Sequence, residues 1–407
     1  MNVGVYIGDA SPEMGGGYTF VHDVLQEIAK QGSGGPHRFT IVTTSPAEDA
    51  ATKLEVLSLA PAMRDLSVRA RVRLSRSVDR LLGRAPAASD WSRPAVDRLL
   101  AGAQIDVMWY LQPAACWSLN VPFITVVWDL QHRLQPYFPE VSAGTQGFIR
   151  DDVYQALLPR ASLVIAGTEA GRDEIVRFYG VAPERIRILP HPTPSFALAA
   201  AAAPGKVRPP SAPEGQYLYY PAQFWPHKNH VNLLEALRLL RERRGLPMVV
   251  ALSSADHGNV AFVKETAARL GIADAVRWLG FVPRDELVGI YQHAFALTYV
   301  TFFGPENLPP LEAFALGCPV VASAVTGARE QLGDAAILVD PRSPEEIAAA
   351  VSRLHDQPSE RAALVERGRA RARRFTGADF VAGVLAWLDE FAPIRRCWPS
   401  GPAAPPG

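Results

Sequence analysis

The block at residues 304–313, Gly-Pro-Glu-Asn-Leu-Pro-Pro-Leu-Glu-Ala, has the composition of an anion-binding helix start. It follows an apolar run that ends at Val300. Asn307 can cap a helix, and Pro309-Pro310 are tolerated in a first turn, where amides lack intrahelical partners. Free amides and the helix dipole at such a start suit a diphosphate. Glu312 can accept two hydrogen bonds from a ribose diol, although a favourable helix-start charge also explains it.

A second block, Tyr-Pro-Ala-Gln-Phe-Trp-Pro-His-Lys-Asn, covers residues 220–229 and precedes an amphipathic helix. Lys228 stands at the helix start, where a cation opposes the dipole, so its place makes sense if it shares an anion with the amides. The alternative is a solvated lysine whose stem packs on Trp225. His227 and His230 have the spacing of helical metal ligands, but no third ligand is evident and Lys228 lies between them. We therefore predict no metal site.

Two further segments follow buried runs. The loop from Gly8 to Gly17 is glycine-rich, and Gly16 and Gly17 let a backbone approach a ligand closely. Its spacing is not G-x-G-x-x-G, so the signal is weak. His132, in the sequence Trp-Asp-Leu-Gln-His-Arg, is either an active-site residue or a loop histidine with a structural hydrogen bond.

The composition of the 407 residues, 48% apolar and 20% charged, is that of a soluble globular protein with large cores. Basic and acidic residues number 41 each, which excludes a global basic field for nucleic acid. Cys116, Cys318 and Cys397 are too few for a disulfide scaffold or a cysteine zinc site. The start lacks the pattern of a signal peptide, and the longest apolar stretch falls short of the ~20 residues that cross a bilayer. We expect a cytoplasmic protein.

Short apolar runs alternate with amphipathic stretches along the chain, which favours an α/β fold with doubly wound parallel sheets. The predicted strands are Val3–Ile7, Phe39–Thr43, Phe123–Val127, Leu163–Ala166, Leu218–Pro221, Met248–Leu252, Phe295–Val300 and Pro319–Ala322. The predicted helices include Thr19–Lys30, Arg150–Leu158, Val231–Arg243, Val260–Leu270 and Pro344–Leu354.

One segment separates the pattern into two halves. Residues 197–213 are rich in Ala and Pro and have no strand period, which indicates an interdomain linker; a surface loop inside one domain is the alternative. We expect domains at 1–196 and 214–376, a last helix at 377–391 and a disordered tail at 397–407. Two doubly wound domains make a cleft, and ligands bind at the carboxyl ends of parallel strands.

The order of these blocks resembles family 4 of the retaining glycosyltransferases, also called glycosyl transferase group 1, over about residues 1–390. The stretch Leu308–Ser323 is the most specific part of the resemblance. The family implies the GT-B fold, in which two Rossmann-like domains face a central cleft. The resemblance places the nucleotide-sugar donor mainly on the second domain and the acceptor mainly on the first, and a final helix crosses back to the first domain.

Matched to the family's E-x7-E motif, Glu312 is the second glutamate, which holds ribose. The first glutamate falls on Gly304, and Glu306 lies two residues later, where it can reach the same sugar hydroxyls by another route. The Gly-Arg pair that precedes the phosphate-binding lysine of the family reads Ala-Gln here, ending at Gln223, while Lys228 is retained.

In the first domain, the family's His-Asp pair reads Trp128-Asp129, with Asp129 and His132 retained nearby. The resemblance therefore implies two sets of site residues. The catalytic set is Asp129, His132, Lys228 and Glu306. The donor-binding set is Gly16, Gly17, Gln223, Lys228, Gly304, Glu306, Asn307, Leu308 and Glu312.

The resemblance implies a retaining, metal-independent hexosyltransferase of cell-surface polysaccharide synthesis. The donor would be a GDP- or UDP-linked sugar, with mannose favoured, and no cofactor is implied beyond this co-substrate. The acceptor would be a saccharide or a lipid-linked saccharide. Two rival functions stay open: a sugar-nucleotide epimerase of the same fold, and a donor-binding protein without turnover.

Residues 64–84 contain seven arginines and an apolar stripe at helical spacing. A basic amphipathic helix can lie on an anionic membrane surface, so peripheral attachment to the inner face of the membrane is a hypothesis. The alternative is a helix packed on its own domain with solvated arginines. A second basic stretch, Arg367–Arg374, is more typical of a solvated helix face.

Overall fold

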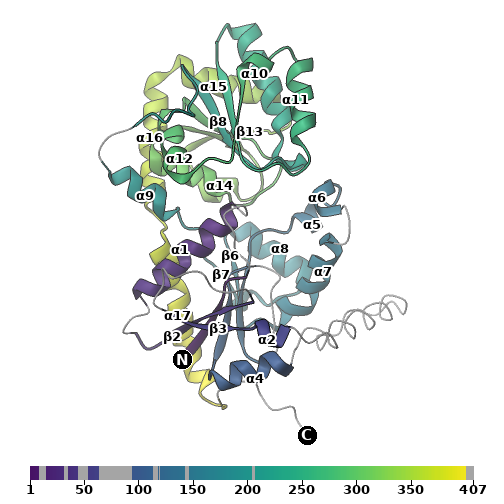
Figure 1. Cartoon of the computed structure of the whole chain (residues 1–407), viewed down its shortest axis with the longest axis vertical. Coiled ribbons are helices and arrows are strands. Elements are labelled where there is room, and N and C mark those ends of the chain that lie inside the picture. Colours follow the sequence, from purple (N-terminus) through teal and green to yellow (C-terminus); the bar gives the residue numbers. More distant parts are fainter. Residues whose placement is uncertain are drawn as a thin grey trace. The chain divides into compact units, whose positions relative to one another are not determined.

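The computed structural model describes residues 1–8, 15–31, 35–44, 54–63, 94–112, 118, 120–142, 146–203 and 207–399 (Figure 1). The chain divides into two compact units. Unit 1 comprises Met1–Leu134, Gly144–Leu189 and Gly377–Gly407, and unit 2 comprises Gln135–Ala143 and Pro190–Thr376. A short segment from the first half of the sequence therefore belongs to unit 2, and the last part of the chain belongs to unit 1.

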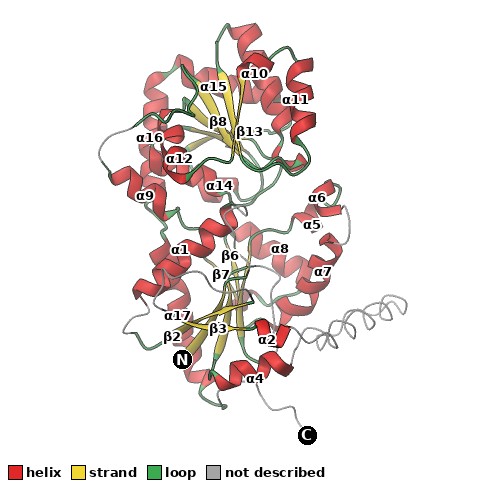
Figure 2. Cartoon of the chain, viewed as in Figure 1, coloured by secondary structure: helices red, strands yellow, loops and turns green. Residues whose placement is uncertain are grey.

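Unit 1 is built on a parallel sheet of seven strands in the order β3-β2-β1-β4-β5-β6-β7, with helices around it (Figure 2). Its central strands are buried along their whole length, which explains their continuous apolar runs. The strands are β1 (Asn2–Tyr6), β2 (Arg38–Thr43), β3 (Glu55–Ser58), β4 (Val107–Tyr110), β5 (Phe123–Val127), β6 (Leu163–Ala166) and β7 (Ile186–Ile188). The helices are α1 (Gly16–Gln31), α2 (Ala60–Met63), α4 (Pro94–Gly102), α5 (Gln131–Leu134), α7 (Gln146–Leu157), α8 (Glu169–Tyr179) and α17 (Gly377–Arg395), with short 3-10 turns η3 (Leu158–Arg160) and η4 (Pro183–Arg185).

Unit 2 has a parallel sheet of six strands in the order β10-β9-β8-β11-β12-β13. The strands are β8 (Tyr217–Pro221), β9 (Val249–Ser253), β10 (Val276–Gly280), β11 (Ala296–Tyr299), β12 (Val320–Ser323) and β13 (Ala336–Val339). The helices are α6 (Pro139–Ser142), α9 (Ser195–Ala202), α10 (His230–Arg244), α11 (Val260–Arg269), α12 (Arg284–His293), α13 (Leu308–Leu316), α14 (Ala328–Leu332), α15 (Pro344–Asp356) and α16 (Pro358–Ala372), with 3-10 turns η5 (Pro226–Lys228) and η6 (Ala273–Ala275).

The predicted α/β fold with doubly wound sheets is confirmed in both units. β5 and β6 have the predicted bounds, and the other predicted strands shift by one or two residues at an end. The strands that the sequence did not reveal include β3 and β10, whose side chains are mostly exposed or half-buried. An edge strand with that burial lacks the apolar run on which the prediction depended.

Each sheet has one point where the strand order reverses. In unit 2 the reversal lies between β8 and β11, which are neighbours in the sheet although 74 residues lie between the end of β8 at Pro221 and the start of β11 at Ala296. Open α/β sheets bind ligands in the crevice outside the carboxyl ends of strands at such a point. The two motif-bearing loops of unit 2 follow these two strands directly.

The expected linker at 197–213 is wrong in its position. Ser195–Ala202 form α9, since alanine has the highest helix propensity, and α9 packs against α13. Ala197 is fully buried there. Further along, Ser211 Oγ donates to Glu286 of α12, which ties this part of the segment to unit 2 as well. The chain passes from unit 1 to unit 2 between Leu189 and Pro190.

The last helix, α17, packs on unit 1 next to α1. The ring of Phe380 lies edge-on to Phe20, with centroids 5.2 Å apart, and stacks near Trp109 at 6.4 Å. Arg395 Nε donates to the carbonyl of Asp106 at 2.9 Å. Arg395 is buried, and α17 ends at this residue, four residues past the predicted end at 391.

The first residues of the expected disordered tail contact the last helix. Arg395 Nη1 donates to the Trp398 carbonyl at 2.9 Å, and its guanidinium lies over the Trp398 ring. Residues 400–407 lie outside the described residues.

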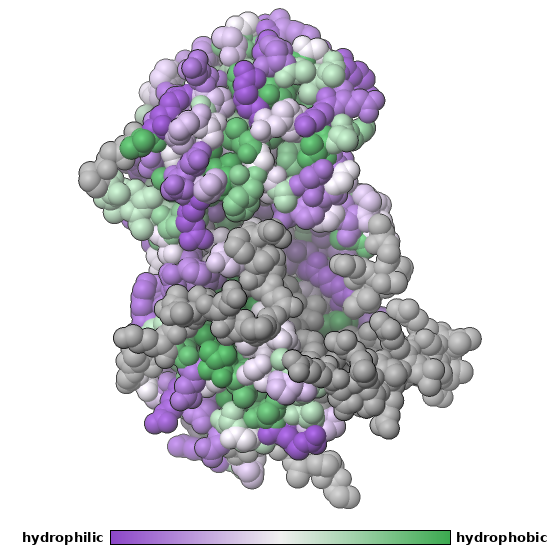
Figure 3. All heavy atoms as spheres, in the orientation of Figure 1, coloured by the Kyte–Doolittle hydropathy of each residue, from purple (hydrophilic) through white to green (hydrophobic). Residues whose placement is uncertain are grey.

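The surface of unit 2 mixes hydrophilic and hydrophobic residues on the face that Figure 3 shows. Its exposed large hydrophobic side chains include Phe262 and Phe281. Within the described ranges, no helix has both the length and the apolar character needed to span a bilayer. The basic stretch 64–84, for which a membrane contact was hypothesised, lies outside those ranges.

Candidate functional site

The loop after β8 presents Lys228 from a rigid 3-10 turn. Within η5, the Lys228 N–H donates to the Trp225 carbonyl at 3.0 Å, and the Tyr220 hydroxyl donates to the Lys228 carbonyl. Asn229 then adopts a left-handed conformation, with φ of 58°, and its side-chain amide donates to the carbonyls of Val300 and Pro341, each at 2.7 Å. Because the backbone N–H and carbonyl of Lys228 are both hydrogen-bonded inside unit 2, the position of its Cα, from which the side chain extends, is fixed.

The Lys228 ammonium reaches the neighbouring strand β11. Its Nζ lies 3.4 Å from the Tyr299 hydroxyl and 5.6 Å from the centre of that ring. The ring of Trp225, on which the alternative interpretation packs the lysine stem, stacks on His257 with centroids 4.0 Å apart. The half-buried ammonium is thus held at the reversal point of the strand order, where a ligand of unit 2 is expected.

The loop after β11 leads into α13 through a constrained turn. Asn307 precedes the helix, but its side chain makes no capping bond and donates instead to the Gly304 carbonyl at 2.9 Å. Its backbone N–H donates to Gln331 Oε1 at 2.9 Å, and Gln331 Nε2 donates back to the Asn307 carbonyl at 3.0 Å. Since Pro309 and Pro310 have no N–H, only Leu308 and Leu311 carry one in the first turn of α13.

Gly304 cannot be replaced without cost in this turn. Its φ of 133° suits glycine, and a Cβ at this position would lie 2.7 Å from the Asn307 side-chain amide. The position of the family's first glutamate is thus occupied by a tight Gly304–Asn307 contact.

Glu312 is one residue past the first turn of α13 and is buried. Its Oε2 accepts a hydrogen bond from the Tyr291 hydroxyl of α12 at 2.7 Å. Burial, with the Glu312 charge, raises the pKa of Tyr291 well above its usual range, so the phenol stays a donor. Tyr291 therefore orients this carboxylate, a partner that the sequence did not reveal.

Glu306 differs from the expectation that it reaches the donor sugar. Its side chain is 2% exposed, and its two oxygens accept from the His191 backbone N–H at 2.8 Å and bind His191 Nδ1 at 2.6 Å. Glu306 thus ties the loop after β11 to the segment where the chain enters unit 2. The two residues are 115 positions apart, so the sequence offered no signal for the pair.

The remaining predicted donor residues fall in both units. Gln223 Oε1 accepts from Trp225 Nε1 at 3.2 Å in the loop after β8. Gly16 and Gly17 form the start of α1 in unit 1, and the loop residues 9–14 before them lie outside the described residues. The structure therefore gathers Gln223, Lys228 and the residues from Gly304 to Glu312 in unit 2.

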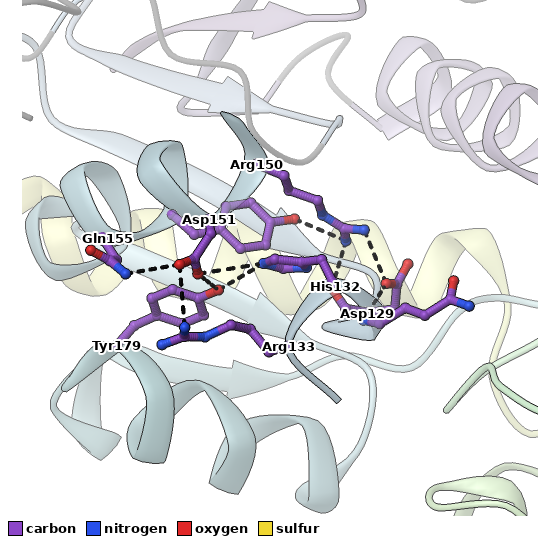
Figure 4. Close-up of polar contacts among 9 residues, drawn as sticks. Asp129, His132, Arg133, Arg150, Asp151, Gln155 and Tyr179 are labelled. Carbon is purple, nitrogen blue, oxygen red and sulfur yellow. Dashed lines mark hydrogen bonds and ion pairs between the residues drawn. The ribbon is translucent and has the colours of Figure 1, made fainter. Parts of the chain in front are cut away.

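Unit 1 carries a polar network at the end of β5, drawn in Figure 4. Asp129 Oδ1 accepts from the Gln131 N–H at 2.9 Å and pairs with Arg150 at 3.1 Å. Burial opposes ionisation of this carboxyl, but the Arg150 charge and the hydrogen bonds from Gln131 and Arg150 together outweigh it and lower the pKa of Asp129. Arg150 also donates to the Asp129 carbonyl at 2.6 Å, so one guanidinium fixes both ends of this residue.

His132 lies inside the same network. Its side chain is 2% exposed, and its Nε2 lies 2.9 Å from the Tyr179 hydroxyl, which donates to Asp151 at 3.0 Å. Burial, with the Arg150 charge, lowers the pKa of His132 to about 4. His132 thus makes the structural hydrogen bond of one interpretation, although from helix α5 and not from a loop, and its active-site role stays a prediction.

Other side chains of the network were not predicted from the sequence. Arg150, Asp151 and Tyr179 belong to α7 and α8, whose helical pattern explained them without a special role. On α8, burial raises the pKa of Glu174 to about 7, and the Asp129 charge adds to this shift. Across the described ranges, no group of three His, Cys, Asp or Glu side chains has the arrangement of a metal site.

Two sequence families match this chain. The model of glycosyl transferases group 1 matches residues 206–371, and that of glycosyltransferase family 4 matches residues 14–194. The two matches leave only eleven residues, 195–205, unmatched between them.

Curated relatives agree with these matches. An O-antigen chain mannosyltransferase B of Escherichia coli is 30% identical over 225 residues, covering 54% of this chain and 58% of that protein. A D-inositol 3-phosphate glycosyltransferase of Streptomyces bingchenggensis is 30% identical over 254 residues, covering 60% and 55%. The chain thus spans a little more than half the length of the curated relatives it matches.

Solved structures share the fold of the chain. Anabaena HepE in complex with UDP has a TM-score of 0.69 at 16% identity, covering 96% of this chain and all of that one. WaaG, a glycosyltransferase involved in lipopolysaccharide biosynthesis, has a TM-score of 0.68 at 16% identity, covering 95% and 99%. The two parallel sheets and the two family matches agree: the chain has the GT-B fold and belongs to the group 1 glycosyltransferases of family 4.

Proposed function

We propose that the protein transfers a hexose, with mannose favoured, from a nucleotide diphosphate sugar to a saccharide or lipid-linked saccharide of the cell surface. We propose further that the anomeric configuration is retained. The observation that carries the proposal is the juxtaposition, inside unit 2, of Lys228 with the strand that leads into the Gly304–Leu308 turn. That arrangement is suited to a diphosphate at the carboxyl ends of β8 and β11.

The donor chemistry follows from these groups. Cleavage of the anomeric C–O bond makes the sugar cation-like and leaves the diphosphate more negative. The ammonium of Lys228 and the N–H group of Leu308, the first residue of α13, are donors that stabilise this charge without rearranging. Glu312, oriented by Tyr291, would accept from the ribose hydroxyls. The leaving phosphate would take the proton of the acceptor hydroxyl on the same face.

The relatives support the sugar and acceptor classes. One matched relative is named for mannosyl transfer in O-antigen chains, and WaaG is described as acting in lipopolysaccharide biosynthesis. HepE was crystallised with UDP and with UDP-glucose. We therefore propose a GDP- or UDP-linked hexose as donor, and a cytoplasmic protein that attaches peripherally to the membrane. We propose no metal or other cofactor, because the Lys228 ammonium can balance the diphosphate charge.

Calorimetric titration with UDP and GDP, followed by turnover of UDP-glucose, UDP-galactose and GDP-mannose, tests the proposal. We expect one nucleotide to bind and its sugar to be released slowly to water, and faster with an acceptor. Turnover in excess EDTA should be unchanged. NMR of the product's anomeric proton should show the donor's configuration.

Three results would contradict the proposal in different ways. Binding without release of nucleotide from any donor would indicate a protein that has lost turnover. Conversion of the sugar without an acceptor would indicate an epimerase. An inverted anomeric centre would overturn retention and leave the transferase assignment intact.

A further inference from the structure

A short segment from the first half of the sequence contacts His227, the residue before Lys228. The chain leaves unit 1 after Leu134, contributes residues 135–142 to unit 2, and returns to unit 1 at Gly144. We call these eight residues the strap. They include α6, which carries Glu140. Among the described residues, the strap is the only part of the sequence before Pro190 that belongs to unit 2.

Glu140 of the strap binds the residue that precedes Lys228. Its Oε1 accepts from the His227 backbone N–H at 3.2 Å and also binds His227 Nδ1. The two side chains are 6% and 11% exposed. Burial alone would raise the pKa of Glu140, but the hydrogen bonds to this carboxylate and the charge of His227 together outweigh burial and lower it. The carboxylate is therefore ionised at neutral pH and holds His227 by backbone and ring together.

The other side of His227 is fixed by the loop after β11. The His227 carbonyl accepts from the Phe302 N–H at 2.8 Å and from the Thr301 hydroxyl at 3.1 Å. Strap residues support the same loop, since Gln135 Nε2 donates to the Phe302 carbonyl at 3.1 Å and the Phe138 ring lies 6.0 Å from the Phe302 ring. His227 is thus bonded at its N–H, its ring and its carbonyl.

From this geometry we infer that Glu140 is a positioning residue for Lys228. It acts through His227 and fixes the turn from which the ammonium meets the donor diphosphate. The inference rests on the proposed function for the identity of the ligand, but the fixing of the turn does not. Groups held in place before the ligand arrives lose less entropy on binding and stabilise developing charge better.

The first test needs no ligand. Amide hydrogen exchange, followed by mass spectrometry of the full chain, reports the opening of residues 226–229. We expect Glu140→Ala to speed exchange of the His227 and Lys228 amides about tenfold or more, since the carboxylate bond to the His227 N–H is lost. Glu140→Gln keeps an acceptor oxygen at the same place and should restore most of the protection.

A matched control comes from another histidine–carboxylate pair. His37 Nε2 lies 2.9 Å from Asp389 Oδ1 in unit 1. Asp389→Asn removes a carboxylate from that pair and should leave exchange at 226–229 unchanged. Unchanged exchange in Glu140→Ala itself would overturn the inference.

The second test asks whether Glu140 acts through Lys228. UDP, GDP and inorganic pyrophosphate are titrated into wild type, Glu140→Ala, Lys228→Ala and the double variant. We expect Glu140→Ala to raise the Kd of the ligand that binds about tenfold in the wild-type background and less than twofold in the Lys228→Ala background. An equal loss in both backgrounds would show that Glu140 does not act through the lysine.

The two tests separate the two claims. If wild type binds none of the three ligands while Glu140→Ala speeds exchange at 226–229, the proposed function fails and the positioning of the turn stands. If ligands bind and neither exchange nor Kd responds to Glu140→Ala, the positioning role fails and the proposed function stands.

Discussion

At the scale of single residues, Lys228 carries the largest expected effect. Its ammonium is half-buried beside Tyr299, and its backbone is bonded on both sides. Loss of one preorganised donor of this kind typically costs about 2.7–4 kcal/mol of transition-state stabilisation. Lys228→Ala should therefore lower kcat for donor turnover by about 10²–10³-fold.

The matched control for this change is Lys30→Ala. Lys30 is an exposed lysine of α1 that pairs with Glu27 at 2.6 Å. Its removal should leave donor turnover at the wild-type value. A wild-type rate for Lys228→Ala in the same assay would remove the lysine from the mechanism.

His132 leads to a prediction about stability and pH. Its folded-state pKa of about 4 lies below the ordinary value of 6.5, so below pH 6.5 the unfolded chain takes up a proton that the folded chain does not. This group stabilises the fold fully above pH 6.5, and its contribution is lost as the pH falls towards 4. Between pH 7 and pH 5 we expect it to lower the unfolding free energy by about 2 kcal/mol.

Urea unfolding at the two pH values measures this loss. His132→Gln should lack that part of the pH dependence. His355→Gln, at an exposed site on α15, controls for the loss of a histidine. A variant whose pH dependence equals that of wild type would show that His132 titrates normally in the fold.

At the scale of elements, the residue before α14 lies in close contact with the backbone of the loop before α13. Gly327 precedes α14 with a φ of 83°, and a Cβ there would lie 2.5 Å from the Pro305 carbonyl oxygen. Gly258 has a similar φ of 89° but open space around it. Any other residue would therefore be strained in its backbone at both positions, and the two positions differ in the close contact that a Cβ would make at residue 327.

Replacing each glycine by alanine separates these two effects. Gly258→Ala should cost about 1 kcal/mol of unfolding free energy through its backbone conformation. Gly327→Ala should cost about 1–3 kcal/mol more, because the Pro305 backbone must move. Denaturant unfolding measures both, and nucleotide titration should show weaker binding for Gly327→Ala alone. If the two substitutions lower the unfolding free energy equally, the loop before α13 moves aside without a measurable cost.

At the scale of the whole molecule, the last helix of the chain completes the first unit. Phe380 of α17 is buried against Phe20 and Trp109, although it lies 360 positions after the first of these. Phe380→Ala should destabilise unit 1 by about 3–5 kcal/mol. Leu354→Ala, at a fully buried position of α15, is the counterpart in unit 2.

Hydrogen exchange measured peptide by peptide can report the stability of each unit separately. Phe380→Ala should speed exchange in α1 and β4 and leave the core of unit 2 protected, whereas Leu354→Ala should do the reverse. Faster exchange throughout the chain in both variants would show that the two units unfold as one.

The sequence by itself determined the fold class, most of the strands in their order, and the positions of the two loops that follow β8 and β11. Those features depend on local patterns: apolar runs of strand length, helix-start prolines, and a glycine at the end of α13 with φ of 76°. Since strands of one parallel sheet end at the same edge, the loops after β8 and β11 had to meet.

Only the tertiary structure decided which side chains hold those loops. Glu140 meets His227 across 87 positions, Glu306 meets His191 across 115, and α9 replaces an expected linker because α13 offers it a surface. A buried carboxylate is stabilised by the hydrogen-bond donor that tertiary packing places next to it. The residues adjacent to the carboxylate in the sequence do not indicate which donor this is. For this reason the loops after β8 and β11 were predictable, and the side chains that hold them were not.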